Sequence, residues 1–328
     1  MTRRPRILLA EPEFSTAARR ILSACGEVVD YGSDEEFRRR LPDAEALVVG
    51  LDVAVRASLL EQAPRLRVIA SRTSQLLHID VDEARRRGIE ILSNEPAAPA
   101  LRRTSSTAEL AIALVLALAR NLPWAFESLK QGRWERRRFG GSELQGKTLG
   151  LVGFGRLGRK VAGYAAALGM NVVVSDPRLT ETEARELDVE SVPLEELLRR
   201  ADVVSLHASY TPGSPPLLGD RQLRALKPST LLVNTARGEL VDEGALLDAL
   251  ANGRLAAAAV DTLAGEEPDG SHLAGNPLVR YAATHDNLLI VPHLGGATAE
   301  ATERTQIYIS ERLVEYLGSR RSAPSGPT

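Results

Sequence analysis

Three residues in the C-terminal half of the sequence have side chains suited to acid–base chemistry on a carbonyl compound: Arg237, Glu266 and His293. Imidazole delivers a proton to oxygen efficiently near neutral pH, and a carboxylate beside it orients the ring and keeps it protonated. The guanidinium of Arg237 offers two parallel hydrogen bonds to a carboxylate and polarises an adjacent carbonyl. Glu267 directly follows Glu266 and is its rival as partner of His293. This set predicts hydride addition to a ketone, with His293 supplying the proton.

A glycine-rich segment upstream predicts where the hydride donor binds. Gly153, Gly155 and Gly158 follow an apolar run and open a helical stretch, which is the G-x-G-x-x-G pattern of a dinucleotide site. These glycines permit a tight turn, a close approach to pyrophosphate, and close packing of helix on strand. Asp176 ends the next apolar run, where a carboxylate accepts the ribose hydroxyls and repels a 2′-phosphate. We therefore expect NAD as cofactor, with Arg178 as the residue that would soften the preference over NADP.

Short apolar runs alternate with helically spaced apolar positions along most of the chain. The first series of runs covers 7–10, 27–31, 46–50, 67–71 and 90–93, and the second covers 148–153, 171–176, 203–207, 231–236, 256–261 and 287–293. This alternation is typical of β-α-β units, which build parallel sheets. The sequence therefore predicts an α/β protein with two domains.

Several segments outside this alternation of strands and helices have patterns that predict other structures. Two prolines among small residues at 94–99 predict a hinge. Beyond it, Ser106 and Glu109 have the spacing of a capping box at the start of a long apolar helix. An amphipathic helix is expected over 298–317, and the Ser-, Pro- and Gly-rich tail 320–328 is expected to be disordered.

Length and composition narrow the class of partner. At 328 residues the chain exceeds the usual size of one hydrophobic core, and 41 Lys and Arg nearly balance 43 Asp and Glu. No overall field would attract nucleic acid or an anionic membrane, so a small molecule is the expected partner. The single cysteine, Cys25, leaves no intrachain disulfide and no Cys-x-x-Cys metal pair, which favours a cytoplasmic location and no metal. The apolar run 7–10 is too short for a signal peptide or membrane span.

As a set these motifs resemble the D-isomer-specific 2-hydroxyacid dehydrogenase family, and its phosphoglycerate dehydrogenase-like members in particular. The segments that carry the resemblance are 143–150, which runs into the glycine-rich turn, 234–238, 261–266 and 292–293. The resemblance implies two Rossmann-like or flavodoxin-like domains with parallel sheets and a homodimer built on the nucleotide domain. The implied boundaries are 1–98 plus 295–328 for a discontinuous substrate domain and 99–294 for the NAD-binding Rossmann domain.

The resemblance also implies roles for individual residues. Arg237 would bind and polarise the substrate, and Glu266 would pair with His293, which exchanges the proton. The five-residue interval from Asp261 favours Glu266 over Glu267. The implied cofactor contacts, besides the glycines and Asp176, are Arg156 and Leu157 at the pyrophosphate, Thr235 and Asp261 near the nicotinamide, and His207, Ala236 and Gly295.

One segment departs from the family pattern. Family members carry a glycine-containing loop before an Ile-Asp pair, and its backbone amides hold the substrate carboxylate. Here the residues 71–78 before that pair include no glycine, so positive φ values are restricted and we expect a reshaped cradle. Our hypothesis is that arginines here bind a second anion on the substrate, a phosphate, phosphonate or carboxylate; solvated surface arginines are the alternative. The expected substrate-binding residues are Arg72, Ser74, Gln75, Arg102 and Arg103, together with Arg237.

The leading function is an NAD-dependent D-2-hydroxyacid dehydrogenase that moves a hydride between the nicotinamide and C2 of a small 2-hydroxy or 2-oxo acid. One alternative is a non-catalytic NAD-responsive interaction protein, because the resemblance extends to transcriptional corepressors. Another is a phosphite or formate dehydrogenase on the same scaffold. Formate is less favoured because the sequence has no additional motif matching that branch.

Overall fold

The computed structural model describes residues 4–11, 13–94 and 98–321 and divides the chain into two compact units. The first unit comprises Met1–Thr104, Glu267–Ser271 and Ala299–Thr328, and the second comprises Ser105–Glu266 and His272–Thr298. The boundaries expected from the sequence, 98/99 and 294/295, lie a few residues away from these. The short return of Glu267–Ser271 to the first unit has no counterpart among the expectations.

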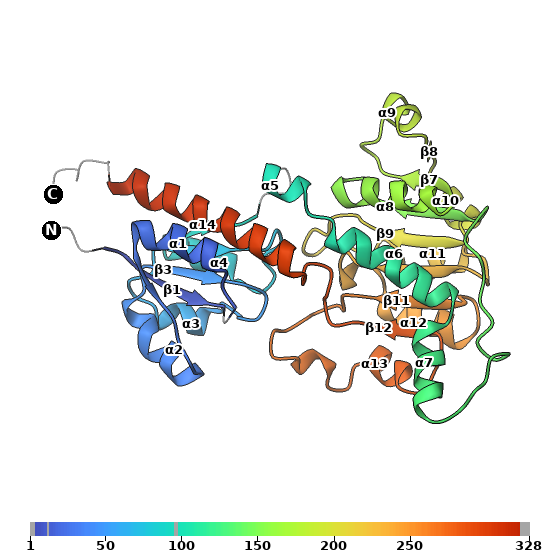
Figure 1. Ribbon diagram of the computed structural model, residues 1–328, viewed down its shortest axis with the longest axis horizontal. Helices are drawn as coiled ribbons and strands as arrows, with labels where there is room; N and C mark the ends of the chain where they lie inside the picture. The colour runs from blue at the N-terminus through green and yellow to red at the C-terminus, as the bar shows by residue number, and fades with distance from the viewer. Residues whose placement is uncertain (1–3, 12, 95–97, 322–328) are drawn as a thin grey trace. The chain divides into compact units, whose positions relative to one another are not determined.

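The first unit is built on a five-stranded sheet in the order β2-β1-β3-β4-β5, with every neighbouring pair parallel (Figure 1). Its strands are β1 (Arg6–Ala10), β2 (Glu27–Val29), β3 (Ala46–Val49), β4 (Val68–Ser71) and β5 (Glu90–Leu92). Its helices are α1 (Thr16–Cys25), α2 (Asp34–Arg40), η1 (Leu41–Asp43), α3 (Ala57–Glu61), α4 (Val81–Arg86), α5 (Pro99–Arg102) and α14 (Ala299–Arg321). The strand order is that of a flavodoxin-like sheet, which changes direction between β1 and β3.

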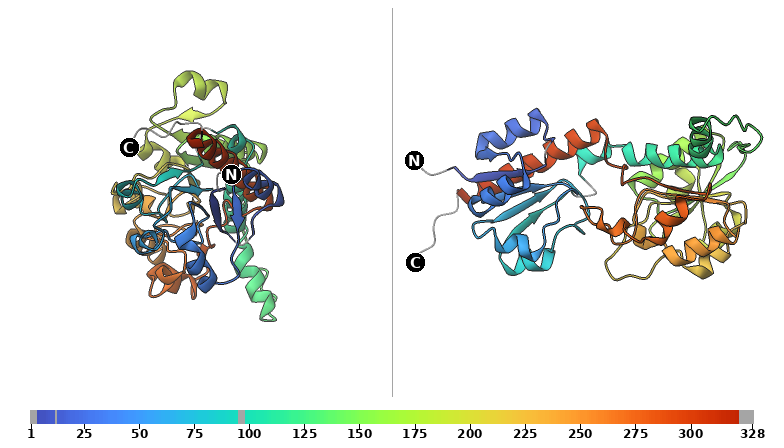
Figure 2. Two further views of the ribbon diagram at one scale, coloured as in Figure 1. Left: turned by 90° about the vertical axis from the view of Figure 1, so that its left-hand side faces the viewer. Right: turned by 90° about the horizontal axis from the view of Figure 1, so that it is seen from below.

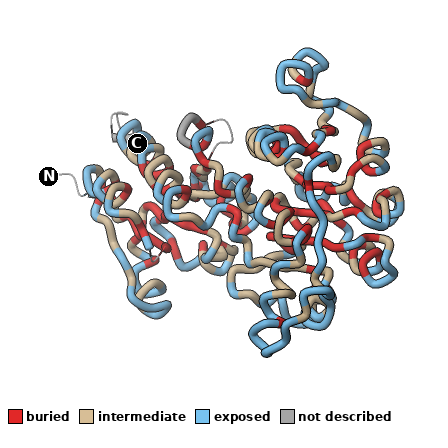
Figure 3. Tube along the Cα trace, turned by 45° about the vertical axis from the view of Figure 1, so that its right-hand side comes forward, coloured by how far each residue is buried: buried red, intermediate tan, exposed pale blue. Residues whose placement is uncertain are grey.

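Both faces of this sheet are covered by helices. Because successive strand residues point to opposite faces, Leu8 packs with Leu60 of α3, whereas Ile7 packs with Leu22 of α1 and Ile309 of α14. Strands buried on both faces read as continuous apolar runs, which explains the pattern in the sequence. In Figure 3 the buried residues, in red, lie mainly inside each unit, and the exposed residues, in pale blue, lie mainly at its outside.

A buried polar side chain, that of Gln306, links helix α14 to the N-terminal part of the first unit. The amide of Gln306 is fully buried, donates to the carbonyl of Glu13 at 2.9 Å and accepts from the backbone N–H of Ser15 at 2.8 Å. Ser15 is the N-cap of α1, so Gln306 fixes the start of that helix. Removing a buried hydrogen-bonding partner of this kind costs about 1–3 kcal/mol.

The second unit has a seven-stranded parallel sheet in the order β12-β11-β10-β9-β6-β7-β8. Figure 2 shows the ribbon in two further views. Its strands are β6 (Thr148–Val152), β7 (Asn171–Ser175), β8 (Glu190–Ser191), β9 (Val203–Leu206), β10 (Leu231–Asn234), β11 (Ala257–Val260) and β12 (Leu288–Ile290). Its helices are α6 (Ser106–Ala119), α7 (Leu122–Lys130), α8 (Arg156–Ala167), α9 (Glu181–Glu186), α10 (Leu194–Arg200), α11 (Asp220–Arg224), η2 (Gly238–Leu240), α12 (Glu243–Ala251) and α13 (Pro277–Ala282), and η3 (Ser271–Leu273) lies at the boundary. The chain winds outward from β6 in both directions, as in a Rossmann fold.

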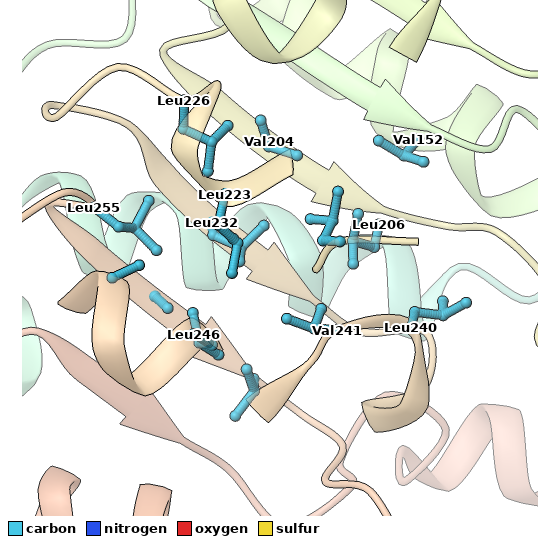
Figure 4. Close-up of a cluster of buried hydrophobic side chains, with 14 of the residues drawn as sticks. Val152, Val204, Leu206, Leu223, Leu226, Leu232, Leu240, Val241, Leu246 and Leu255 are labelled. Carbon is cyan, nitrogen blue, oxygen red and sulfur yellow. The ribbon is translucent and has the colours of Figure 1, made fainter. Parts of the chain in front are cut away.

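The core of the second unit also lies on both faces of its sheet. On one face Leu206 and Leu232 pack among leucines and valines of the following loops and helices, such as Val241 and Leu246 (Figure 4). On the other face α6 and α8 pack against alternate residues of the same strands. The winding reverses between β6 and β9, and in open sheets ligands bind at the carboxyl ends of the strands beside such a reversal.

The α/β class with parallel sheets is confirmed, and the expected strands appear at the expected places, most of them shortened by a residue or more at an end. The two-residue strand β8 was not expected. The capping box at Ser106 is wrong: Ser105 is the N-cap, and Ser106 is a buried residue inside the helix. The final helix extends beyond 317 to Arg321. Much of the expected hinge (95–97) and tail (322–328) lies outside the described residues.

A search of the described helices for membrane spans finds no single helix of sufficient length and apolar character. The pair α6 and α7, which meet at a 64° bend, passes together on length and composition alone. Several residues of α6 belong to the core beneath the sheet of the second unit.

Candidate active site

The glycine-rich turn joins β6 to α8 at the point where the winding of the second sheet reverses. Gly153 has a φ of 93°, and a side chain there would lie 2.6 Å from the backbone nitrogen of Ala208. A Cβ on Gly158 would lie 2.5 Å from the carbonyl oxygen of Gly153. At Gly155, which caps α8, a Cβ would meet nothing within 4 Å. The turn is therefore closed on its protein side and open at Gly155, as a pyrophosphate cradle requires.

Asp176 lies beside this turn at the end of β7. Its carboxylate accepts from the backbone N–H of Phe154 at 2.7 Å and from that of Arg178 at 2.8 Å. Burial alone would raise the pKa of Asp176, but these hydrogen bonds and the Arg178 charge hold it below its ordinary value. Arg178 is itself largely exposed. An ionised carboxylate at this position fits the ribose end of NAD.

His207 follows β9 on the opposite side of the same turn. Its backbone N–H donates to the carbonyl of Val152 at 2.7 Å, and its Nε2 lies 2.9 Å from the hydroxyl of Ser205. Burial lowers the pKa of His207 to about 4. The ring is therefore neutral at physiological pH.

The segment after β10 is folded into a tight turn by one asparagine side chain. Asn234 donates through Nδ2 to the carbonyl of Arg237 at 2.7 Å and accepts from the backbone N–H of Ala236 at 3.0 Å. Thr235 is buried within the turn. Burial lowers the pKa of Arg237, while the negative charges of Glu266, Glu239 and Asp261 oppose that shift. Arg237 is thus a partly buried cation placed among carboxylates.

His293 and Glu266 form the central contact of the site. The Nδ1 of His293 lies 2.6 Å from the carboxylate of Glu266, and both side chains are about one-quarter exposed. Burial would raise the pKa of Glu266, but the hydrogen bond and charge of His293, the Leu263 amide and Arg237 hold it below its ordinary value. An ionised Glu266 accepts from Nδ1–H, so this contact engages Nδ1 of the ring and does not involve Nε2.

The loop that presents Glu266 is held through its backbone amides. Three successive N–H groups each donate to a different carboxylate: Leu263 to Glu266 at 2.8 Å, Ala264 to Glu243 at 2.7 Å and Gly265 to Glu239 at 3.3 Å. A Cβ on Gly238 would lie 2.0 Å from the carbonyl carbon of Leu263, so only glycine fits beneath this loop. The Arg237 turn and the Glu266 loop are consequently packed backbone against backbone.

Asp261 fixes the other half of the pair. Its carboxylate accepts from the backbone N–H groups of Leu294 and Gly295 at 2.5 and 2.9 Å, and its carbonyl accepts from that of His293 at 2.9 Å. Burial raises the pKa of Asp261, although both amides and His293 act against this. His293 has a φ of 52°, an uncommon conformation for a residue other than glycine. The buried carboxylate thus holds His293 in the backbone conformation that aims its ring at Glu266.

The sequence of this chain is similar to those of known proteins of one family. Residues 112–295 match the family model described as D-isomer specific 2-hydroxyacid dehydrogenase, NAD binding domain. The chain is 37% identical to a hydroxypyruvate reductase of Thermotoga maritima over 87% of its own length and 88% of that protein. The chain belongs to the D-isomer specific 2-hydroxyacid dehydrogenase family.

Other relatives of this family differ in length. A D-3-phosphoglycerate dehydrogenase of Methanocaldococcus jannaschii is 39% identical over 95% of this chain, but the chain spans only 57% of that protein. The crystal structure of the TT0316 protein from Thermus thermophilus is similar over 98% of this chain and 99% of its own, with a TM-score of 0.77 and 34% identity. The fold is therefore similar to that of this solved structure over nearly the whole chain. Most of the segment that matches the family's NAD binding domain lies in the second unit.

The structure separates the two glutamates that the sequence leaves as rivals. Glu266 contacts His293, whereas Glu267 accepts two hydrogen bonds, at 3.0 and 2.9 Å, from the guanidinium of Arg56. The same guanidinium donates to the carbonyl of Leu77, in the atypical loop of the first unit. Glu267 thus pairs with Arg56 inside the first unit, to which it belongs, and not with the histidine.

The atypical loop folds without any residue at positive φ. The hydroxyl of Ser71 lies 2.8 Å from that of Thr73, which donates to the carbonyl of Gln75 at 2.7 Å. Ser74 is exposed. Side-chain hydrogen bonds from Ser71 and Thr73 therefore shape the loop where the family pattern uses glycine.

The arginines proposed from the sequence lie in different surroundings. Arg72 forms an ion pair with Glu11, whereas Arg102 and Arg103 are exposed at the end of α5. Arg72 is therefore not the free cation that the second-anion hypothesis requires. No local pattern indicates this pairing, because Glu11 is 61 positions away from Arg72.

Sequence reasoning also missed Asn234, Glu239 and Glu243 as supports of the site. Asn234 stands directly before the Thr-Ala-Arg-Gly segment, and its turn-forming tendency is a signal that was available. The two glutamates act on amides more than twenty residues away. Contacts over such separations leave no signature in the residues around them.

We predict that replacing Glu266 by glutamine will lower kcat roughly 100-fold, since oriented acid–base catalysis contributes about 10²- to 10⁴-fold. The amide keeps the size of the side chain but removes the negative charge that supports a protonated His293. Glu267→Gln is the matched control and should change kcat less than about threefold, because a half-exposed ion pair contributes little. Steady-state kinetics of both variants test this. Equal losses in the two variants would contradict the assignment.

We predict that His207→Gln will flatten the acid side of the stability profile. With a pKa of about 4 in the folded state and 6.5 ordinarily, the folded protein binds fewer protons at His207 than the unfolded chain between these values. The resulting stability is fully present above pH 6.5 and lost as the pH falls toward 4. Urea denaturation at several pH values measures the slope. A slope in the variant as steep as in the wild type would show that His207 is not responsible.

Proposed function

We propose that the protein is an NAD-dependent D-2-hydroxyacid dehydrogenase, in which a hydride moves between the nicotinamide and C2 of a small 2-hydroxy or 2-oxo acid. The observation that carries this proposal is the 2.6 Å contact between His293 and Glu266, with Arg237 as a partly buried cation in the same cluster. These are the groups that a C2 carbonyl and its neighbouring carboxylate need. The D configuration follows from the family alone.

His293 serves as the proton-exchanging group in either direction. During reduction its Nε2 gives a proton to the carbonyl oxygen, and during oxidation the same nitrogen takes the proton of the hydroxyl. Glu266 accepts from Nδ1 throughout and stabilises the protonated ring. Asp261 positions the backbone on the other side of His293. Both carboxylates therefore act through the histidine.

Arg237 is assigned to the substrate carboxylate. Its charge is partly buried, and an ion pair formed there is screened less than one on the surface. A planar guanidinium also binds a carboxylate in two places and so fixes the orientation of C2. Gly238 allows the backbone of this turn to lie directly against the Glu266 loop, which sets the distance between the binding and proton-exchanging groups.

The residues suited to hold NAD are those of the glycine-rich turn and Asp176. Gly155 leaves open space at the N-terminus of α8, where backbone N–H groups attract pyrophosphate, and Asp176 suits the ribose hydroxyls. Arg156 and Leu157 lie in the first turn of α8, and His207 lies against Gly153 and Gly158 of the glycine-rich turn. When bound, NAD supplies or accepts the hydride.

The relatives are named for different acids, so their names do not identify the part of the substrate beyond C2. One relative is named for hydroxypyruvate, which has one carboxylate, and another for phosphoglycerate, which has a phosphate as well. The sequence suggested that Arg72 binds a second anionic group of the substrate. Because Arg72 is paired with Glu11, the proposed function does not include such a group.

We predict that the purified protein will oxidise NADH, in preference to NADPH, in the presence of 2-oxo acids such as glyoxylate, pyruvate or hydroxypyruvate. Absorbance at the NADH band measures the rate. His293→Asn should lower kcat by about 10²-fold or more while NADH binding, measured by fluorescence, persists. Nucleotide binding with no turnover of any 2-oxo or D-2-hydroxy acid would refute the proposal and favour the non-catalytic alternative.

We also propose a homodimer formed through the second unit. Leu122, Phe126 and Leu129 are spaced along one face of α7 and are 56%, 65% and 51% exposed, and Trp134 just beyond is 84% exposed. In the left view of Figure 2, α7 is the green helix that extends from its unit. An apolar stripe of this kind is typical of an interface that a second chain covers.

Phe126→Glu is expected to convert the dimer to a monomer, because it places a charge in the centre of the apolar stripe. Leu187→Glu is the matched control, since Leu187 is 43% exposed elsewhere in the second unit and should leave the dimer intact. Light scattering after size-exclusion chromatography gives the masses. A monomeric wild type, or dimers in both variants, would overturn the proposal.

A further inference from the structure

Two arginines of the second unit lie around the carboxylate that the proposed function assigns to the cofactor ribose. Arg178 follows Asp176 in the loop after β7, and its backbone N–H donates to the Asp176 carboxylate at 2.8 Å. Arg159 belongs to the first turns of α8. In dinucleotide sites an acid at this position binds the 2′-hydroxyl of NAD, whereas a nearby arginine accommodates the 2′-phosphate of NADP. This end of the site therefore contains side chains suited to either cofactor.

The residue Phe154 connects Arg159 with Asp176. The backbone N–H of Phe154 donates to the Asp176 carboxylate at 2.7 Å, and its carbonyl accepts from the Nε of Arg159 at 3.2 Å. The guanidinium of Arg159 also lies 5.0 Å from the centre of the Phe154 ring. Phe154 stands between Gly153 and Gly155 of the glycine-rich turn. Arg159 and Asp176 are thus bound to the two peptide groups of one residue in the cofactor turn.

Glu183, in the first turn of α9, neutralises Arg159. One oxygen of its carboxylate accepts from a terminal nitrogen of Arg159 at 3.2 Å. The other oxygen accepts from the backbone N–H and the hydroxyl of Thr180 at 3.2 and 3.0 Å, which completes the capping box of α9. The hydrogen bonds from Thr180, together with the hydrogen bond and charge of Arg159, hold the pKa of Glu183 below its ordinary value. The carboxylate is therefore ionised at neutral pH.

Each arginine at this end of the site is consequently paired with an acid. Arg178 is 79% exposed, and its Nε lies 3.5 Å from the carboxylate of Asp176. Arg159 is 39% exposed and is held both at Nε and at a terminal nitrogen. A 2′-phosphate would have to compete with a carboxylate for either guanidinium, and both acids would repel it. Of the two arginines, the one with the more fixed position is the one that Glu183 occupies.

We propose that Glu183 is a second cofactor-selectivity residue, which acts with Asp176 to exclude NADP by occupying the guanidinium of Arg159. This inference rests on the proposed function and deepens it, because it concerns the edge assigned to the adenosine ribose of NAD. Asp176 opposes a 2′-phosphate by direct repulsion. Glu183 neutralises the arginine that would otherwise bind the phosphate, so the selectivity depends on two acids from separate turns of the chain.

The test measures dissociation constants of nucleotides, so it needs no substrate and no turnover. Fluorescence titration gives the Kd values of NADH and NADPH, and calorimetry with 5′-AMP and adenosine 2′,5′-bisphosphate isolates the contribution of the 2′-phosphate. The wild type should bind NADH at least tenfold more tightly than NADPH. Glu183→Gln should lower the ratio of the NADPH Kd to the NADH Kd about fivefold, as expected for one partly exposed charge pair. The gain should shrink with added salt.

Glu183→Gln is expected to fold, because glutamine serves the capping box as well as glutamate does. Glu181→Gln makes the same change of charge in the same turn of α9, but Glu181 is 87% exposed and pairs with Arg185. It should leave the ratio of Kd values unchanged. Combining Glu183→Gln with Arg159→Gln should abolish the gain, since the guanidinium that would bind the phosphate is then missing.

The outcomes distinguish this inference from the function on which it rests. A wild type that binds neither NADH nor NADPH overturns the assignment of the nucleotide site. Absence of turnover with every 2-oxo acid overturns the proposed reaction, whereas the Kd values still decide the role of Glu183. Equal Kd values for NADH and NADPH in the wild type, or a Glu183→Gln ratio equal to that of Glu181→Gln, overturn that role. A gain that persists without Arg159 overturns it as well, because the effect is then a general loss of negative charge.

Discussion

The hydrogen bonds that carboxylates accept from backbone amides hold the candidate site together. Asp261 fixes the segment after His293, and Glu239, Glu243 and Glu266 fix the loop before Glu266. Charge-assisted bonds of this type are about twice as strong as neutral ones, and here they order two loops that have no regular structure. The 2.6 Å contact between His293 and Glu266 is the result of this double support. Flexible loops alone would not maintain it.

The acidic residues serve different purposes because their surroundings differ. Glu266 is kept ionised by the histidine and arginine charges next to it, whereas burial raises the pKa of Asp261. Glu11 neutralises a base in the first unit, and Glu267 binds Arg56 there. Each role depends on which donor faces the carboxylate, since the chemical group is the same in every case.

The sequence was sufficient for those features that local patterns encode. Apolar runs revealed both parallel sheets, and the spacing of Gly153, Gly155 and Gly158 revealed the turn before α8. The five-residue interval from Asp261 led to Glu266. Contacts between segments distant in the sequence could not be predicted. Arg72 was expected to bind an anion of the substrate, but in the structure it pairs with Glu11. The lack of glycine in that loop was visible, but the hydroxyl network that replaces it was not.

The buried amide of Gln306 has a consequence for the order in which the protein folds during synthesis. Helix α14 covers the first sheet and fixes the start of α1, yet it is synthesised after the whole of the second unit. Domains generally fold as units as they emerge. The second unit is complete before α14 is made and can reach its native state first, whereas the sheet face that α1 and α14 share is until then covered by α1 alone. A nascent chain stalled before residue 299 would therefore expose the rest of that face to chaperones.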